Sequence, residues 1–152
     1  MMKENLKKLE EKLLKEKQLK EQEKEKSRTY AEEKKIQNDN FIKKYRSIEA
    51  SIIRKSMSEI EKVVKKFNYQ LDIQDDKGVK IYYPHIVFLL QRTGVISPIE
   101  IIFVGNYDNN KIEIRFIPNK LEQHQEVTSH NIEDVTEELI SSEINKLFKV
   151  EE

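Results

Sequence analysis

The chain has 152 residues, and its 28 basic and 28 acidic side chains cancel to a net charge of zero. It contains no cysteine, which excludes disulfides, cysteine–zinc sites and thiol nucleophiles. The longest purely apolar run, Ile86–Leu90, is far shorter than the roughly 20 residues of a membrane helix. The first residues mix both charges and do not resemble a secretory signal, so we expect a soluble, cytoplasmic protein with no membrane partner.

The two halves of the chain carry opposite net charges. Residues 1–68 hold 20 of the 28 basic side chains and 13 of the 28 acidic ones, so the first half is positive and the second half is negative. Such asymmetry predicts that the basic half meets something negative. The negative partner is a nucleic acid, an acidic protein or the acidic half of this chain.

Residues 1–38 are predicted to form a charged helical arm, because they lack glycine and proline and consist mostly of Lys, Glu, Gln and Leu. Four apolar residues have the 4-3-4 spacing of a coiled-coil seam: Met2, Leu6, Leu9 and Leu13. The same register then places polar residues at the core positions: Glu16, Lys20, Glu23 and Ser27. The arm is therefore either coiled-coil-like or a solvated or partly disordered tail. Asn38–Asn40 is the predicted break before a head domain of residues 39–152.

Residues 41–68 form a predicted amphipathic helix with a broad apolar sector. This sector exceeds what one sheet face covers, so we predict a homodimer or higher oligomer. The candidate residues for self-association are Phe41, Tyr45, Ile48 and Ile52.

The opposite side of the same helix is strongly basic. Most solvated helices mix the two charges, because like charges four residues apart repel each other. This stripe is a candidate for contacting phosphates without reading the base sequence. The candidate anion-binding residues are Lys43, Lys44, Arg54, Lys55, Lys62, Lys65 and Lys66.

The remaining residues predict a four-stranded antiparallel meander followed by a C-terminal helix, which gives an α+β fold. The expected strands cover residues 69–74, 79–91, 95–104 and 111–117, separated by turn sequences. In the last strand apolar and charged residues alternate, as expected at a sheet edge. A polar loop at 119–130 precedes a helix near 132–149, capped by Asn131. The acidic residues of this helix are the internal candidates for pairing with the basic stripe.

The sequence contains no recognisable catalytic, cofactor-binding or metal-binding motif. Its three glycines lie in separate turns, and its histidines, His85, His124 and His130, do not form a ligand pair of helical spacing. No nucleophile turn of the Gly-x-Ser-x-Gly type occurs. We therefore predict a non-catalytic module for assembly or for binding an unidentified protein, and the alternative is a protein that binds nucleic acid through the basic stripe.

Overall fold

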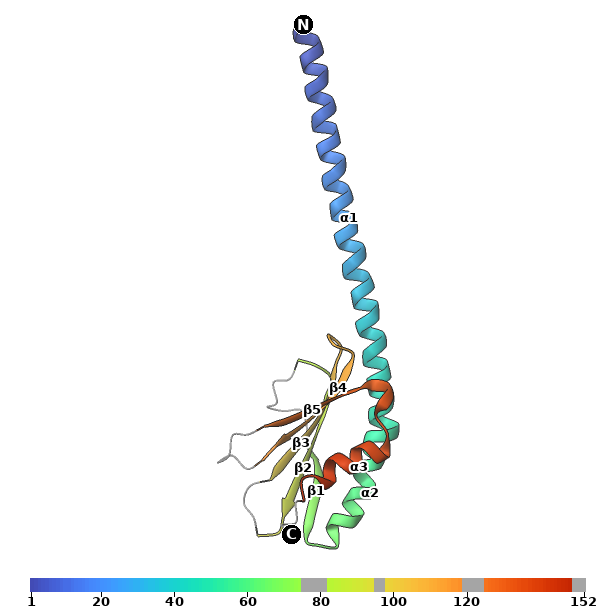
Figure 1. Cartoon of the computed structure of the whole chain (residues 1–152), viewed down its shortest axis with the longest axis vertical. Helices are drawn as coiled ribbons and strands as arrows, with labels where there is room; N and C mark the ends of the chain where they lie inside the picture. Colours follow the sequence, from blue (N-terminus) through green and yellow to red (C-terminus); the bar gives the residue numbers. More distant parts are fainter. Residues whose placement is uncertain (75–81, 95–97, 119–124, 149–152) are drawn as a thin grey trace. The chain divides into compact units, whose positions relative to one another are not determined.

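The computed structural model describes residues 1–74, 82–94, 98–118 and 125–148. The chain divides into two compact units, Met1–Asp39 and Asn40–Glu152, here called the N-terminal and C-terminal units. The elements, in chain order, are α1 (Met2–Ile48), the π-helix η1 (Glu49–Ile53), α2 (Arg54–Lys65), β1 (Tyr69–Gln74), β2 (His85–Arg92), β3 (Ile99–Asn106), β4 (Lys111–Ile117), β5 (Glu126–Asn131), the 3₁₀ helix η2 (Ile132–Asp134) and α3 (Glu137–Asn145) (Figure 1). The fold is therefore α+β, as predicted.

The N-terminal unit is helical throughout from Met2. Its apolar side chains are exposed, and each residue of the seam from Met2 to Leu13 is more than half exposed. The helix does not break at Asn38–Asn40 as predicted, because α1 continues without interruption to Ile48, although the two compact units divide at Asp39 and Asn40. Asn and Asp favour a helix start but do not prevent an ongoing helix, and no glycine or proline interrupts this one.

The C-terminal unit contains a five-stranded antiparallel sheet in the order β1-β2-β3-β4-β5. The prediction of four strands is wrong, since β5 occupies Glu126–Asn131, most of which was expected to belong to the loop at residues 119–130. Its residues pair along β4, with Thr128 opposite Ile114 and His130 opposite Ile112. The edge of the sheet is consequently β5 rather than β4, and Glu113 of β4, expected to face water, is buried.

The two central strands are buried on both faces, as the sequence predicts. Phe88, Ile101 and Phe103 belong to a large core cluster that also contains helix residues. Val87, Ile102 and Val104 form a second cluster. Because side chains alternate along a strand, the two clusters lie on opposite faces of the sheet. The helices η1, α2 and α3 lie against the face of the large cluster (Figure 1).

The C-terminal helix is shorter than predicted and begins later. A 3₁₀ turn occupies Ile132–Asp134, and α3 starts only at Glu137. Thr136, rather than Asn131, caps this helix, because its hydroxyl oxygen accepts a hydrogen bond of 3.1 Å from the backbone N–H of Leu139. Ile140 and Ile144 then point into the large core cluster.

Tyr45 connects the helical layer to strand β3. Its side chain is fully buried, and its hydroxyl donates a hydrogen bond of 2.9 Å to the carbonyl oxygen of Phe103. The ring lies directly on Gly105, where an added Cβ would stand 2.6 Å from Tyr45 Cγ. Gly105 is therefore required for space: no larger residue fits beneath this ring without a shift of the helix.

We expect Gly105→Ala to destabilise the C-terminal unit by about 1–3 kcal/mol, the usual cost of overpacking a well-filled core. The cost should largely disappear in a Tyr45→Ala background, because the ring that the new methyl group meets is then gone. Urea denaturation of the wild type, both single variants and the double variant measures this coupling. Equal costs in both backgrounds would show that the contact between the ring and Gly105 does not limit the packing.

Candidate functional site

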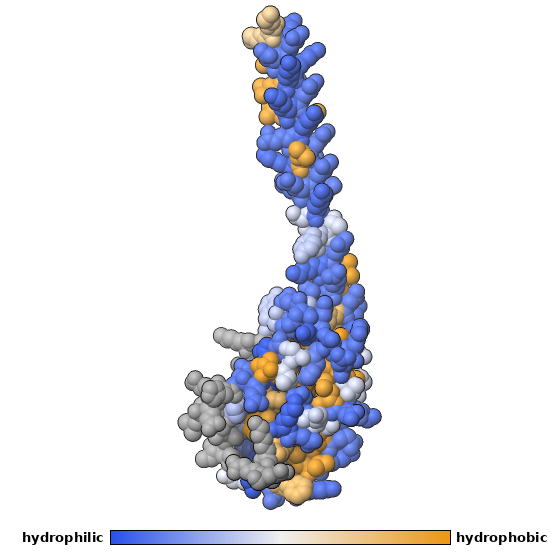
Figure 2. All heavy atoms as spheres, in the orientation of Figure 1, coloured by the Kyte–Doolittle hydropathy of each residue, from blue (hydrophilic) through white to orange (hydrophobic). Residues whose placement is uncertain are grey.

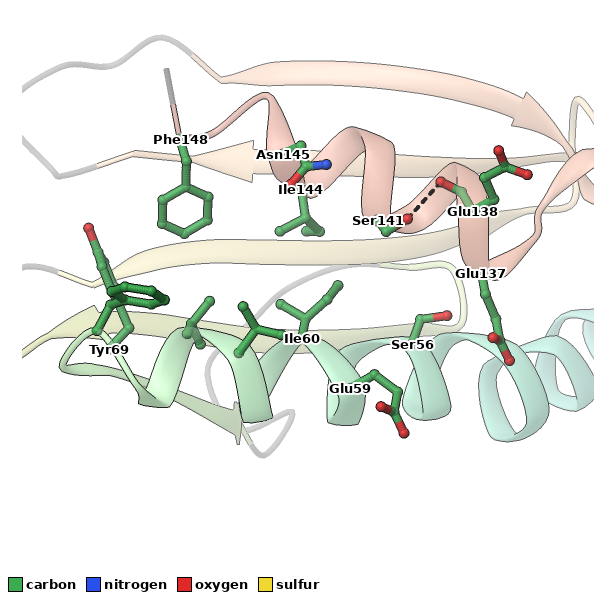
Figure 3. Close-up of a pocket in the computed structure, with 13 residues that line it drawn as sticks. Ser56, Glu59, Ile60, Tyr69, Glu137, Glu138, Ser141, Ile144, Asn145 and Phe148 are labelled. Carbon is green, nitrogen blue, oxygen red and sulfur yellow. Dashed lines mark hydrogen bonds between the residues drawn. The ribbon is translucent and has the colours of Figure 1, made fainter. Parts of the chain in front are cut away.

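A groove with a volume of about 940 Å³ lies between α2 and α3, and we call it the α2–α3 groove (Figure 3). Side chains from both helices and from the start of β1 point into it. The residues that give it an apolar lining are Ile60, Val63, Val64, Phe67, Tyr69, Ile144 and Phe148. Apolar surface is also visible among the charged residues of the C-terminal unit in the space-filling view (Figure 2).

The groove forms because the apolar sector of α2 is wider than its packing surface. Val64 is buried against the core, whereas Val63 and Phe67 are 56% and 67% exposed. At the end of the groove, the rings of Tyr69 and Phe148 meet edge to face, with 5.4 Å between their centroids. Exposed aliphatic and aromatic side chains that share one concave surface are typical of a docking site rather than of an ordinary helix surface.

Every charged residue that lines the described part of the groove is acidic: Glu59, Glu137 and Glu138. Glu137 lies 3.2 Å from Lys55 Nζ, and Glu59 lies 3.5 Å from Lys62 Nζ. These pairs are exposed, so each contributes little to stability. The groove therefore has an apolar floor and an acidic rim.

The residues predicted for self-association lie elsewhere. Phe41 and Tyr45 are buried in the large core cluster, and Ile48 and Ile52 are half-buried against it. All four pack within the C-terminal unit. The exposed part of the apolar sector is instead its last turn and a half, around Val63 and Phe67. The sequence pattern contained both residues, but it could not show which part of the sector the sheet and α3 leave uncovered.

The basic stripe is partly neutralised within the chain. Lys44 lies 3.6 Å from Glu133 and Lys55 lies 3.2 Å from Glu137, so residues near the start of the C-terminal helix meet the stripe. Arg54 and Lys62 are within 4 Å of carboxylates of their own helical segment, Glu49 and Glu59. Among the described residues, no carboxylate pairs with the remaining three candidates: Lys43, Lys65 and Lys66.

Glu49 is a buried carboxylate that the sequence analysis did not single out. It lies in η1 and is only 5% exposed. Arg46 donates to it at 2.6 Å, and Arg54 approaches its other oxygen at 3.7 Å. Both arginines therefore serve to compensate an internal charge, since an unpaired carboxylate at this depth would be costly. The signal in the sequence was an acidic residue four positions from both Tyr45 and Ile53, within an otherwise apolar stripe.

A second polar cluster lies on the other face of the sheet. Asn106 donates a hydrogen bond of 2.8 Å to Glu113, and Arg115 donates two more to the other oxygen of this carboxylate. Burial acts to raise the pKa of Glu113, but these hydrogen bonds and the charge of Arg115 outweigh burial and lower the pKa below its ordinary value.

Nearby, Tyr83 donates a hydrogen bond to Asp108, and the rings of Tyr83 and Tyr107 meet edge to face. Desolvation and a hydrogen bond with Tyr82 raise the pKa of Tyr107 to about 12. Tyr83 and Tyr107 keep their protons at neutral pH because the pKa of each is raised, while Glu113 stays ionised with its donors in place. Such groups stabilise a surface but are not tuned for proton transfer near pH 7.

The two described histidines, His85 and His130, do not share a metal-binding group. His85 is buried, and its Nδ1 lies 2.8 Å from the carbonyl oxygen of Tyr83. His130 Nε2 lies 3.6 Å from Glu143, which also accepts a hydrogen bond from Lys146. His124 lies outside the described residues. Within the described ranges, no three acidic, histidine or cysteine side chains are grouped so that they could hold a metal ion.

No protein-family model, curated protein or solved structure matches this chain. In the part of the chain that the structure describes, no helix combines the length and the apolar content that a membrane span needs.

We expect Glu113 to make the stability of the folded protein depend on pH in the acid range. Because its pKa is lower in the folded protein than in the unfolded chain, its contribution is complete above the unfolded value, about 4.3, and is lost as the pH falls through the folded value. Glu113→Gln should therefore lower the melting temperature most at neutral pH, and the difference between the two curves should shrink as the pH falls below the unfolded pKa of about 4.3. A difference that is constant from pH 7 to pH 3 would contradict this assignment. Glu126→Gln, at the exposed sheet edge, is the matched control.

Proposed function

We propose that this protein is a non-catalytic assembly module that associates with further copies of itself through its helices. The observation that supports this proposal is the α2–α3 groove, whose apolar lining includes the exposed side chains Val63 and Phe67. A folded unit that leaves a phenylalanine in solvent beside a concave apolar surface gains free energy when another surface covers both.

The magnitudes favour association. Full burial of an exposed valine or phenylalanine contributes about 1.5–3 kcal/mol each, and the groove offers several further half-covered side chains. Association costs at least about 4 kcal/mol in lost translational and rotational freedom, so one exposed residue alone would not be enough. The groove brings several such side chains together on one surface, so a partner that covers them together can offset this cost.

The N-terminal unit supplies a second exposed apolar surface. Leu6, Leu9 and Leu13 lie on one side of a long helix and are each more than half exposed. A helix with this charge content has no core of its own, so its apolar residues are available to a partner. Self-association through helices therefore has two candidate surfaces in each copy, the seam of α1 and the α2–α3 groove.

We expect the purified chain to form a dimer or larger oligomer at tens of micromolar. Light scattering coupled to gel filtration measures the mass directly, against 18.2 kDa for the single chain. The mass should fall toward that of the single chain on dilution, since a small apolar surface with a charged rim forms a reversible contact. A mass near 18 kDa at every concentration up to 100 µM, or about 2 mg/ml, would exclude self-association.

The alternative function, phosphate binding along the basic stripe, is supported by Lys43, Lys65 and Lys66, for which the described residues provide no carboxylate. If these three lysines bind duplex DNA, the affinity should be weak, with a log–log salt slope of about −3 at −0.9 per phosphate. Reversing all three to Glu should then abolish binding, whereas reversing Lys17, Lys20 and Lys24 of α1 should not. Fluorescence anisotropy with mixed-sequence DNA at two salt concentrations tests this alternative.

A further inference from the structure

We propose that the α2–α3 groove binds the helical segment Met2–Leu13 of a second copy of the chain. This inference rests on the proposed self-association and specifies which two surfaces meet. Each surface is exposed within its own unit, and each has the features that the other requires: the segment supplies a narrow apolar stripe on a helix, and the groove supplies an apolar floor between two helices.

The spacing of the stripe suits a groove better than a coiled coil. Met2, Leu6, Leu9 and Leu13 are at i, i+4, i+7 and i+11, the pattern by which an amphipathic helix anchors in a hydrophobic groove. A coiled coil needs the same pattern over at least three or four heptads. Here the register continues into Glu16 and Lys20, which form an exposed ion pair at 3.4 Å, so the apolar stripe ends after two heptads.

The lengths of the two surfaces agree. From Met2 to Leu13 the helix rises about 16 Å at 1.5 Å per residue. The wall of the groove runs from Ser56 in α2 to Phe67 in the turn that follows this helix, which is the same number of residues and a comparable length. All four anchors can therefore contact the groove at once, and a longer stripe would extend beyond its ends.

The charges favour the segment Met2–Leu13, rather than the groove of another copy, as the partner of the α2–α3 groove. The charged residues of the described groove lining are Glu59, Glu137 and Glu138, of which Glu59 and Glu137 already pair with Lys62 and Lys55. Two grooves placed face to face would still oppose like charges at Glu138, whereas a segment with lysines beside its stripe would not. The stripe is flanked on its two sides by Lys3 and Lys12, with Glu10 as an acidic neighbour, and residues 1–20 contain seven lysines and four glutamates. A basic amphipathic helix is therefore the better complement to an acidic rim.

The proposed contact joins two different surfaces, so it is heterologous. Two copies that exchange their segments reciprocally form a closed dimer, and copies that do not close form an open chain. In both arrangements each copy supplies one stripe and uses one groove. This property makes the contact testable by complementation between defective variants.

The experiment uses two full-length variants. The stripe variant carries Leu6→Glu and Leu9→Glu, and the groove variant carries Val63→Glu and Phe67→Glu. All four side chains are exposed, so both variants should keep the wild-type circular dichroism spectrum and melting temperature. Each variant alone should dissociate at least tenfold more readily than the wild type. The mixture should regain a one-to-one complex, because the groove of the stripe variant and the stripe of the groove variant are both intact.

Matched controls carry the same kind of change away from these surfaces. Leu14→Glu with Leu19→Glu alters exposed apolar residues of α1 outside the stripe, and Val127→Glu alters an exposed residue of β5. Both controls should associate as the wild type does. Sedimentation velocity with a fluorescent label on one variant distinguishes the mixed complex from either protein alone. If the groove variant loses its fold, the pair Val63→Ser and Phe67→Ser replaces it in the same mixing experiment.

The outcomes separate the two proposals. A monomeric wild type removes both the assembly function and this inference. An oligomeric wild type whose groove variant still associates normally would show that association does not need the groove, and this would overturn the inference while leaving the function. Two monomeric variants whose mixture stays monomeric would also overturn it. The mixture contains one intact groove and one intact stripe, so these two surfaces would then not bind each other.

Discussion

The packing of Tyr45 on Gly105 fixes the helical layer against the sheet. The ring has no free space beneath it, and its hydroxyl bonds to the carbonyl oxygen of Phe103, so both the distance and the rotation of the helix are determined at this point. The same helical segment continues through η1 into α2. Its rotation therefore decides which side chains of α2 face the core and which remain outside. Val64 is placed inside, and Val63 and Phe67 are left exposed beside α3. The groove therefore results from the way the helical layer packs on the sheet.

The π-helix η1 explains how one helical stretch stays in contact with the sheet over such a length. The buried residues Phe41, Tyr45, Glu49, Ile53 and Met57 are spaced four apart. In a regular α-helix each step of four residues advances about 40° around the axis, so the buried stripe would turn away from the sheet. The wider turn of the π-helix at Glu49–Ile53 offsets this drift. This buried row of residues includes Glu49, whose charge is compensated by Arg46 and Arg54. Part of the basic stripe therefore has a structural task and is not free to bind an external anion.

The sequence predicted the elements that depend on local pattern. The bounds of β1 and β4 match the predicted strands, and the apolar runs of β2 and β3 are buried on both faces as expected. The strand β5 was missed because its residues, from Glu126 to Asn131, are mostly polar; its strand structure comes from pairing along β4, a long-range contact that no local pattern shows. The ion pairs of Lys44 and Lys55 join the basic stripe to acidic residues that the sequence had offered as internal partners. Which residues pair could not be predicted, because it depends on where the turn before Thr136 directs Glu133 and Glu137. The candidate site was only partly predictable for the same reason. Its α2-side residues belong to the apolar sector of the sequence, but which of them stay exposed depends on how the helices pack on the sheet.

The proposed partner segment is a helix without a core, and this determines the character of its binding. Helices without tertiary packing depend on intrinsic propensity and on side-chain pairs such as Glu16 with Lys20, each of which contributes only a few tenths of a kcal/mol. The first turns of such a helix fray, so docking of Met2–Leu13 must also order them. Part of the free energy gained in the groove is consequently spent on helix formation, which lowers the affinity and makes it sensitive to helix propensity far from the contact. A surface that recognises a segment in this way suits reversible assembly: the apolar stripe provides the attraction, and the cost of ordering the helix keeps the complex able to dissociate.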